Sequence, residues 1–195
     1  MLRSVQAEDR DDQKGVEILM KDFSRNNPRF SLCGLNCRLR PMNISGHCGG
    51  CGFGNQSCRI VRCSLEHGKP EYCFQCPEYP CEKYENIDAF DFFITHRNQK
   101  TDMEKMRRIG EEAYNAEQSE KRKILDRLLA DYNDGRKKTL FCLAVNLLPP
   151  EDLRTIFEEG DMDLLLKERA KAMEKRLRER SEADPKPLTL RRKAK

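Results

Sequence analysis

Nine cysteines between residues 33 and 81 constrain the fold of this chain more than any other feature of its sequence. They form four groups: Cys33-x3-Cys37, Cys48-x2-Cys51, Cys58-x4-Cys63 and Cys73-x2-Cys76-x4-Cys81. The same stretch has seven glycines, four prolines and no sustained hydrophobic periodicity. Because such a segment cannot build an ordinary apolar core, we expect links between the cysteines to hold it together.

The rest of the sequence indicates which kind of link to expect. Residues 1 to 14 are charged and polar, unlike a signal peptide, and no apolar run approaches the roughly 18 residues of a membrane span. We therefore expect a cytoplasmic protein that does not enter a membrane. Cytosolic thiols stay reduced, so dense cysteines there favour metal or redox chemistry; in an exported protein the same residues would form disulfides.

The cysteine spacing favours metal bound through thiolates. A two-residue gap lets both thiolates of a pair bind one ion, and the glycines between Cys48 and Cys51 allow the tight turn that this requires. Zinc takes four ligands, so nine cysteines suffice for two structural zinc sites, whose binding would supply folding free energy. The predicted ligands are Cys33, Cys37, Cys48, Cys51, Cys58, Cys63, Cys73, Cys76 and Cys81.

The spacing leaves two questions open. An iron–sulfur or redox-active protein is the alternative, because iron–sulfur clusters also take four thiolates, although the closely spaced ferredoxin-type run is absent. The grouping of the ligands is the second question. Closing neighbouring cysteines costs the least loop entropy, which predicts one ion between Cys48, Cys51, Cys58 and Cys63. The second ion would draw on Cys33, Cys37, Cys73, Cys76 and Cys81.

Other residues of this stretch have weaker claims to a role. His47 and His67 could each replace a cysteine as a ligand, whereas His96 fits a capping or core position. The basic residues would offset the negative charge of thiolate sites: Arg38, Arg40, Arg59, Arg62 and Lys69. The aromatic residues could stack on bases, but they fit better as a small core around the metals: Phe53, Tyr72, Phe74, Tyr79 and Tyr84.

No catalytic constellation accompanies the cysteines. The chain has no Gly-x-Ser-x-Gly, no phosphate-binding glycine loop and no His-Glu-x-x-His. We therefore expect an interaction module with a protein partner that the sequence does not identify, rather than an enzyme.

The cysteine motifs resemble domain of unknown function 3795, a group of small cysteine-rich bacterial and archaeal proteins. The similarity rests on CGLNC, CGGC, CRIVRC and CFQCPEYPC, and covers roughly residues 30 to 95. It implies a metal-binding module without a settled activity. Members of that family often have a third cysteine before the proline of the first motif, where this chain has Arg40 before Pro41. A site at this position would then be completed by another group or not be occupied.

Two short helices are predicted next to the cysteine-rich stretch. Apolar residues at helical spacing indicate an amphipathic helix over residues 13 to 24, which Pro28 would end. After Cys81, Asp88 can cap a short aromatic-rich helix over residues 90 to 94.

From Thr101 onwards the pattern predicts a helical bundle. Thr101 and Glu104 have the spacing of a capping box, and an apolar stripe then continues until the turn residues 133 to 135. The pattern leaves open whether Gln118 and Ser119 divide this stretch into two helices.

Three more helices are predicted after that turn. Residues 140 to 148 are apolar on nearly every side, which indicates the central helix of the bundle, with Cys142 as a buried apolar residue. Pro150 suits the first turn of a helix from Leu153 to Glu159. Asp161 would cap a last helix with the stripe Leu166, Ala170, Met173 and Leu177.

These elements predict a mainly α fold with a small irregular cysteine-rich metal-binding module and a C-terminal helical bundle. The expected parts are an N-terminal arm (1–29), the module (30–98), the bundle region (99–180) and a disordered basic tail (181–195). Only the bundle has an apolar core of its own, so we expect it to keep its helices when a chelator removes the metal.

Positive charge is concentrated at the C-terminal end. Residues 167 to 195 contain 12 Lys and Arg against 5 Asp and Glu, in a chain with a net charge of +4. Exposed basic clusters bind phosphates without sequence preference, so we expect any nucleic-acid binding to be weak, non-specific and carried by the tail. A solvated helix with a frayed basic end is the plainer interpretation of the same residues.

Overall fold

The computed structural model describes residues 20–53, 57–182 and 187–193. Over these residues the chain forms seven α-helices, four 3-10 helices and no β-strand, which confirms the mainly α class. None of the described helices is long and apolar enough to cross a membrane.

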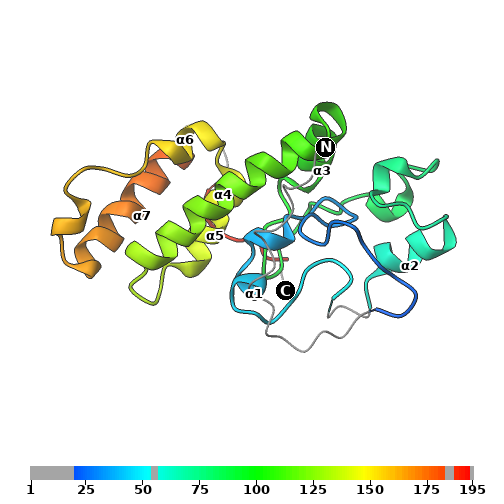
Figure 1. Ribbon diagram of the computed structural model, residues 1–195, viewed down its shortest axis with the longest axis horizontal. Coiled ribbons are helices and arrows are strands. Elements are labelled where there is room, and N and C mark those ends of the chain that lie inside the picture. The colour runs from blue at the N-terminus through cyan, green and yellow to red at the C-terminus, as the bar shows by residue number, and fades with distance from the viewer. Residues whose placement is uncertain (1–19, 54–56, 183–186, 194–195) are drawn as a thin grey trace, which may run out of the picture.

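The molecule is elongated, with the cysteine-rich part at one end and a helical bundle at the other (Figure 1). Helix α4 (Glu111–Asp131) extends between the two ends. Its C-terminal half forms the bundle with α5 (Lys138–Leu147), α6 (Pro150–Arg154) and α7 (Leu166–Glu182). Helix α3 (Gln99–Ile109) packs against α4.

The bundle core is built around α5, as predicted. Every residue from Leu140 to Leu147 is buried, and all of these side chains except Asn146 share one apolar cluster with residues of α4 and α7 such as Leu128 and Met173. Cys142 lies within that cluster, which confirms it as a buried apolar residue. Pro149, with an extended backbone, follows the helix and prevents it from continuing.

Gly110 separates α3 from α4. Its φ of 86° and ψ of 159° belong to a region that essentially only glycine adopts. Helix α4 continues through Gln118 and Ser119, so the division that the sequence left open is at Gly110 instead. The predicted capping box is wrong, because α3 begins at Gln99 and the hydroxyl of Thr101 donates to the Asn98 carbonyl from inside the helix (3.0 Å).

The segment after α5 differs from its prediction in two details. Pro150 is in the first turn of α6, as expected, but the helix ends at Arg154 rather than continuing to Glu159. Asp161 does not cap α7. It lies in η4 (Asp161–Asp163), where its buried carboxylate pairs with Arg176 and accepts a hydrogen bond from the Tyr132 hydroxyl (2.8 Å). Because these contacts use the Asp161 side chain, it is not available to cap α7.

Within α7, the predicted stripe is mostly confirmed. Ala170, Met173 and Leu177 are buried, whereas Leu166 is exposed at the first residue of the helix.

Neither short helix predicted beside the cysteines is present in the described residues. Residues 20 to 24 form a turn, in which the Met20 N–H donates to the Gly52 carbonyl (3.0 Å); residues 13 to 19 lie outside the described residues. Residues 90 to 94 are irregular. The Asp91 carboxylate there accepts from the backbone N–H groups of His96 (2.7 Å) and Arg191 (2.8 Å), contacts that a helix would not allow.

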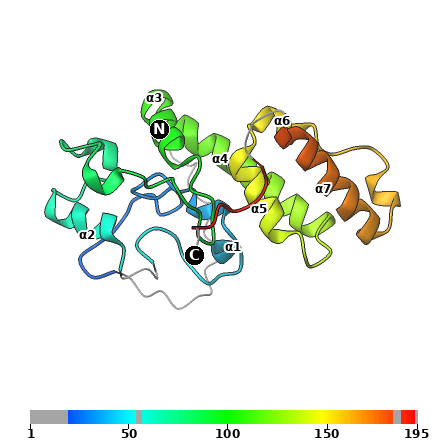
Figure 2. The same ribbon diagram turned by 180° about the vertical axis from the view of Figure 1, so that it is seen from behind.

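The tail residues 187 to 193 return to the irregular segment around Asp91 (Figure 2). Leu188 is buried in the bundle core, and the Asp91 N–H donates to the Arg191 carbonyl (2.8 Å). Arg97 donates to the Pro187 carbonyl (2.5 Å). The expectation of disorder beyond Ser181 is therefore wrong for residues 187 to 193, because one apolar side chain and one buried carboxylate anchor them.

The cysteine-rich part consists of loops with short helices: η1 (Cys37–Leu39), α1 (Pro41–Ile44), α2 (Arg59–Glu66), η2 (Cys73–Gln75) and η3 (Glu82–Tyr84). Sequence reasoning missed α2, which is too short to show a sustained period. Its Ile60 and Val61 are buried in a small apolar cluster with Phe23 and Leu32.

A third apolar cluster joins the cysteine-rich part to α3 and α4. Phe30 and Tyr72 pack there against Met103, Met106 and Tyr114, and the rings of Phe30 and Tyr114 are 4.7 Å apart. Tyr72 is buried, and Tyr84 is buried as well, which fits the expectation that these aromatic residues form a core rather than a stacking surface.

Candidate metal centre

The nine clustered cysteines are all free thiols in the structure. Cys37 is buried and the other eight are half-buried, so none is fully exposed to solvent. Within the described ranges, no three or more His, Cys, Asp and Glu side chains are arranged as a group that could hold a metal ion. The positions of the thiols nevertheless divide them into two sets.

Four cysteines line one small pocket, and we call them the pocket set: Cys63, Cys73, Cys76 and Cys81. The pocket has a volume of about 30 Å³, which is enough for a single ion or water molecule. Its other walls include the apolar side chains of Leu32 and Ile60 and the rings of Tyr79 and Tyr84. Thiols from α2 and from the η2 region thus face the same space.

Local structure places each member of the pocket set. Cys63 lies in the second turn of α2, and Cys73 begins η2. The Cys76 N–H donates to the Cys73 carbonyl (3.0 Å), which closes the two-residue turn between these cysteines. The Cys73 N–H donates to the Leu32 carbonyl (2.9 Å) and ties this turn to the loop that carries Cys33.

His67 also lines the pocket, and its Nδ1 is 3.6 Å from the Cys63 sulfur. Its Nδ1 lies 2.7 Å from the Cys63 carbonyl oxygen, and its Nε2 lies 3.3 Å from Oε1 of Glu78. The hydrogen bond to the Cys63 carbonyl, with the charge of Glu78, raises the pKa of His67. The ring is thus an outer partner of the pocket set rather than a free ligand.

Four further cysteines precede Cys58 in the chain, and we call them the arginine-flanked set because guanidinium groups contact two of their sulfurs: Cys33, Cys37, Cys48 and Cys51. Cys37 is within electrostatic reach of the other three members. The hydroxyl of Ser31 is 3.2 Å from the Cys33 sulfur. Cys48 points its sulfur towards the Phe53 carbonyl oxygen (3.3 Å).

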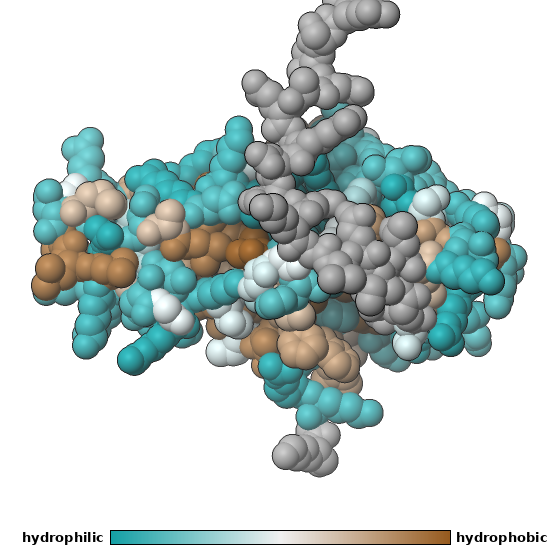
Figure 3. Space-filling view, turned by 60° about the horizontal axis from the view of Figure 1, so that its bottom comes forward, coloured by the Kyte–Doolittle hydropathy of each residue, from teal (hydrophilic) through white to brown (hydrophobic). Residues whose placement is uncertain are grey.

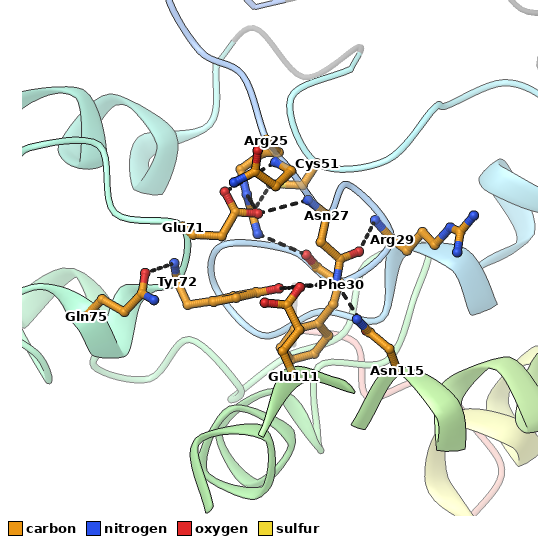
Figure 4. A network of polar contacts seen from close by, with 11 residues as sticks. Arg25, Asn27, Arg29, Phe30, Cys51, Glu71, Tyr72, Gln75, Glu111 and Asn115 are labelled. Atoms are coloured by element: carbon orange, nitrogen blue, oxygen red, sulfur yellow. Dashed lines mark hydrogen bonds and ion pairs between the residues drawn. The ribbon is translucent and has the colours of Figure 1, made fainter. Parts of the chain in front are cut away.

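Two guanidinium groups contact sulfur atoms of this set. Arg40 Nη2 donates to the Cys48 sulfur (2.9 Å), and Arg25 Nη1 donates to the Cys51 sulfur (3.4 Å). Figure 4 shows Arg25 between Cys51 and Glu71, whose carboxylate is 3.0 Å from Arg25 Nε. Arg40 is the residue at the place where the resembled family often has a third cysteine, and here its side chain reaches a sulfur.

Burial favours the neutral form of four of these thiols. It raises the pKa of Cys33 to about 11 and that of Cys37 to about 12, and it also raises the pKa of Cys51 and Cys73. Burial alone would lower the pKa of Arg25 and Arg40, but the pKa of each is raised overall, by Cys51 and Glu71 for Arg25 and by the surrounding cysteines for Arg40. A bound cation reverses the effect on thiols by stabilising the thiolate form.

Cys58 belongs to neither set as a fourth ligand. It is the residue before the first turn of α2 and packs with Cys33 and Cys51 against the small apolar cluster. The grouping predicted from sequence, in which Cys58 and Cys63 share an ion with Cys48 and Cys51, stays a prediction; of these four cysteines only Cys63 lines the pocket. At about 100° per helical residue, a five-residue step across α2 turns Cys63 away from the direction of Cys58.

The remaining predicted residues have ordinary roles. His47 is exposed, and His96 lies in the irregular segment, with Nδ1 3.1 Å from the Ile87 carbonyl oxygen. Sequence reasoning counted Arg40 only as a charge near the cysteines and did not consider Arg25, which precedes the cysteine window. No sequence signal assigns either arginine to a particular sulfur.

A polar network connects this region to α4 (Figure 4). The Tyr72 hydroxyl donates to Oε1 of Glu111 (2.7 Å), and Asn27 donates to Asn115 (3.1 Å). Both acceptors lie in the first turns of α4. The loops that carry the arginine-flanked set are therefore fixed to the helical part through side chains far apart in sequence.

Comparison of the chain with protein-family models, curated proteins and solved structures finds no match of any of the three kinds. The resemblance to domain of unknown function 3795 thus gains no support from them and stays a prediction.

Proposed function

We propose that this chain is a metal-binding protein that holds structural zinc through cysteine thiolates and acts as an interaction module. One observation carries the proposal: Cys63, Cys73, Cys76 and Cys81 line the same pocket although they come from two separate segments. Four thiolates are the ligand set that structural zinc sites use. The apolar walls of the pocket would keep water from competing for the ion.

The donor set fits zinc better than the harder metals. Sulfur ligands select zinc, copper(I) and iron–sulfur clusters, whereas magnesium and calcium take oxygen ligands. The helices flanking the pocket are short and joined by irregular loops, so metal binding would supply stability that apolar packing alone does not.

A protein partner remains part of the proposal. Side chains at the junction of η4 and α7 are exposed and apolar: Met162, Leu164, Leu165 and Leu166. Figure 3 shows hydrophobic residues at the end of the bundle that carries this junction. Groups of this kind are typical of surfaces that bind other proteins, and they are the first place to look for a contact.

The metal content of two cysteine variants tests the proposal. Cys76→Ser removes a pocket ligand, so protein purified under reducing conditions should lose one equivalent of zinc by elemental analysis. Cys58→Ser is the matched control, because serine is a favourable residue at a helix N-cap and Cys58 lies outside the pocket. It should keep the wild-type metal content.

Two results would contradict the proposal. Wild-type protein that folds without any metal would remove its basis. A brown sample with iron and sulfide in place of zinc would establish the iron–sulfur alternative. Cobalt(II) substitution gives a further readout, since a four-thiolate site produces intense sulfur-to-cobalt absorption that Cys76→Ser should weaken.

A further inference from the structure

Three phenylalanines in the irregular segment between η3 and α3 are exposed to solvent. Phe90 is 47% exposed, Phe92 is 69% exposed and Phe93 is 66% exposed. The ring centroids of Phe92 and Phe93 are 6.3 Å apart, and the ring planes differ by 55°. Large aromatic side chains normally bury most of their surface in a core or an interface, so this pair of open rings is a candidate binding surface.

We propose that Phe92 and Phe93, together with Arg191, Arg192 and Lys193 of the tail, form a binding surface for single-stranded nucleic acid. Bases would stack on the two rings, and the basic side chains would contact the phosphates. We call these five residues the phenylalanine–tail surface. It includes none of the clustered cysteines, so the inference does not depend on the metal proposed above.

The first argument is that the backbone holds the rings and the tail next to each other. The Asp91 N–H donates to the Arg191 carbonyl (2.8 Å), and the Arg191 N–H donates back to the Asp91 carboxylate (2.8 Å). The Phe92 N–H donates to the Ile94 carbonyl (3.2 Å), and the Arg192 guanidinium donates to the Phe92 carbonyl (3.1 Å). A surface that is ordered before the ligand arrives loses less entropy on binding.

The second argument is the positive charge beside the rings. Arg191, Arg192 and Lys193 are consecutive and exposed. The partner of the Arg192 guanidinium is a carbonyl oxygen, which accepts a hydrogen bond without neutralising the charge. Basic side chains of this kind bind phosphates by releasing counterions from the nucleic acid.

The acidic side chains of the irregular segment do not cancel this charge. Asp88 pairs with Lys100 (3.0 Å), and the buried Asp91 is 3.6 Å from Arg97 and 3.7 Å from Arg191. Residues 88 to 100 contain two carboxylates and two Lys or Arg side chains, so the three basic tail residues leave a formal charge of +3. The charge of the surface is therefore complementary to a phosphodiester chain.

The combination of rings and charge fits a single strand better than a duplex or a lipid surface. Base stacking on aromatic rings next to basic side chains is how proteins hold single strands without sequence preference. In a duplex the faces of the bases are already stacked on one another. Recruitment to anionic lipid usually takes four or more basic residues or an amphipathic helix, and residues 90 to 94 are irregular.

Fluorescence anisotropy with a labelled deoxythymidine oligonucleotide of about 12 nucleotides tests the inference on the full chain. Wild type should bind this strand more tightly than the thymidine–adenine duplex of equal length at the same salt concentration. Phe92→Ala should weaken binding about 5–100-fold, the range for losing one stacked base. Phe92→Leu keeps the apolar bulk without a π-face and should also bind weakly, whereas Phe92→Tyr should bind like wild type. Leu165→Ala is the control, because Leu165 is an exposed apolar residue of the η4–α7 junction.

A pair of charge variants tests the role of the tail. Arg192→Gln combined with Lys193→Gln should weaken binding and make it less dependent on salt, because two phosphate contacts are lost. Lys171→Gln combined with Arg180→Gln removes the same charge from exposed positions of α7 and should have a smaller effect. Equal losses in the two double variants would show that only the overall charge attracts nucleic acid, and would overturn the inference.

Three further results would contradict the phenylalanine–tail surface. Equal affinity for the single strand and the duplex would exclude stacking. Wild-type affinity in both Phe92→Ala and Phe92→Leu would exclude a role for the ring. Binding of wild type to phosphatidylserine-containing vesicles that Phe92→Ala removes, without any binding of the oligonucleotide, would identify a lipid surface instead.

Discussion

Asp161 illustrates at the residue scale how one side chain can hold a connection in place. Its buried carboxylate accepts from Arg176 Nη1 (2.8 Å), from the Tyr132 hydroxyl (2.8 Å) and from the Glu158 N–H (3.2 Å). The Arg176 hydrogen bond and the other donors hold the pKa of Asp161 well below its usual range. The short segment between α6 and α7 is thereby fixed to both α4 and α7.

Asp161→Asn should therefore destabilise the protein by about 3 kcal/mol at pH 7, because it removes the buried carboxylate of Arg176 and leaves only the exposed Glu158 as its partner. The folded-state pKa is lowered, so this stabilisation is complete above the unfolded value of about 4 and is lost as the pH falls below it. Urea unfolding at pH 7 and pH 3 should show the difference from wild type shrinking. Asp163→Asn, at an exposed neighbour, is the control; an equal difference at both pH values would contradict the prediction.

The cysteines show how far residue-level reasoning reaches. Their number and spacing can be read directly from the sequence, and the expectation of metal rather than disulfides follows from them and stays a prediction. Which cysteines line one pocket could not be predicted, because it depends on the short helix α2, which begins after Cys58 and contains Cys63. The arginine contacts were equally hidden, since Arg25 approaches Cys51 across 26 positions of sequence.

At the scale of elements, Gly110 is the hinge point between two helices that the sequence pattern joined. Its backbone conformation is one that a residue with a Cβ adopts only under strain. The space around it is open, because an added Cβ would meet no atom within 4 Å. Backbone strain, and not crowding, is therefore what requires glycine here.

Gly110→Ala should destabilise the protein by about 1–3 kcal/mol through this strain alone. Glu112→Ala, two residues further along in α4, is a control that leaves the backbone conformation unchanged. Thermal unfolding followed by circular dichroism would measure both. An alanine at position 110 with the stability of the control would mean that the two helices tolerate fusion into one.

The elements that sequence predicted best are those with long, strong apolar patterns. Helix α5 is apolar on all sides, and the end of α4 is marked by turn residues after Tyr132, so packing and local preference agree. The helix predicted around Phe92 is absent, because the Asp91 carboxylate accepts hydrogen bonds from the backbone N–H groups of His96 and Arg191. The helix predicted over residues 13 to 24 is absent from residues 20 to 24, where the Met20 N–H donates to the Gly52 carbonyl of a separate turn.

At the scale of the whole molecule, the tail residues 187 to 193 connect the bundle to the irregular segment around Asp91. Leu188 is inserted into the bundle core, while Arg191 binds Asp91 through its backbone. The side chain of Arg192 donates to the Phe92 carbonyl (3.1 Å). Weak nucleic-acid binding through the tail stays a prediction. Arg191 and Arg192 already have partners within the molecule.

Removing residues 187 to 195 should cost about 1.5–3 kcal/mol for the lost burial of Leu188 alone, with further loss from Asp91 and Arg97. The melting temperature should fall, and trypsin should cleave the segment around Arg97 faster. Lys193→Ala, at an exposed position near the end of the described tail, serves as the control and should behave like wild type. An unchanged melting temperature after truncation would show that the tail contacts do not contribute to stability.

The two ends of helix α4 pack against different parts of the molecule, so we expect them to open to solvent independently. Its first turns are held by Tyr72 and Asn27 of the cysteine-rich part, while Leu125 and Leu128 are packed in the bundle core. Amide protons along one continuous helix should therefore exchange with solvent at two different rates. If the protein holds the zinc proposed above, removing it should speed exchange near Tyr114 and leave the amides near Leu128 slow, so that a single helix reports separately on each end of the protein.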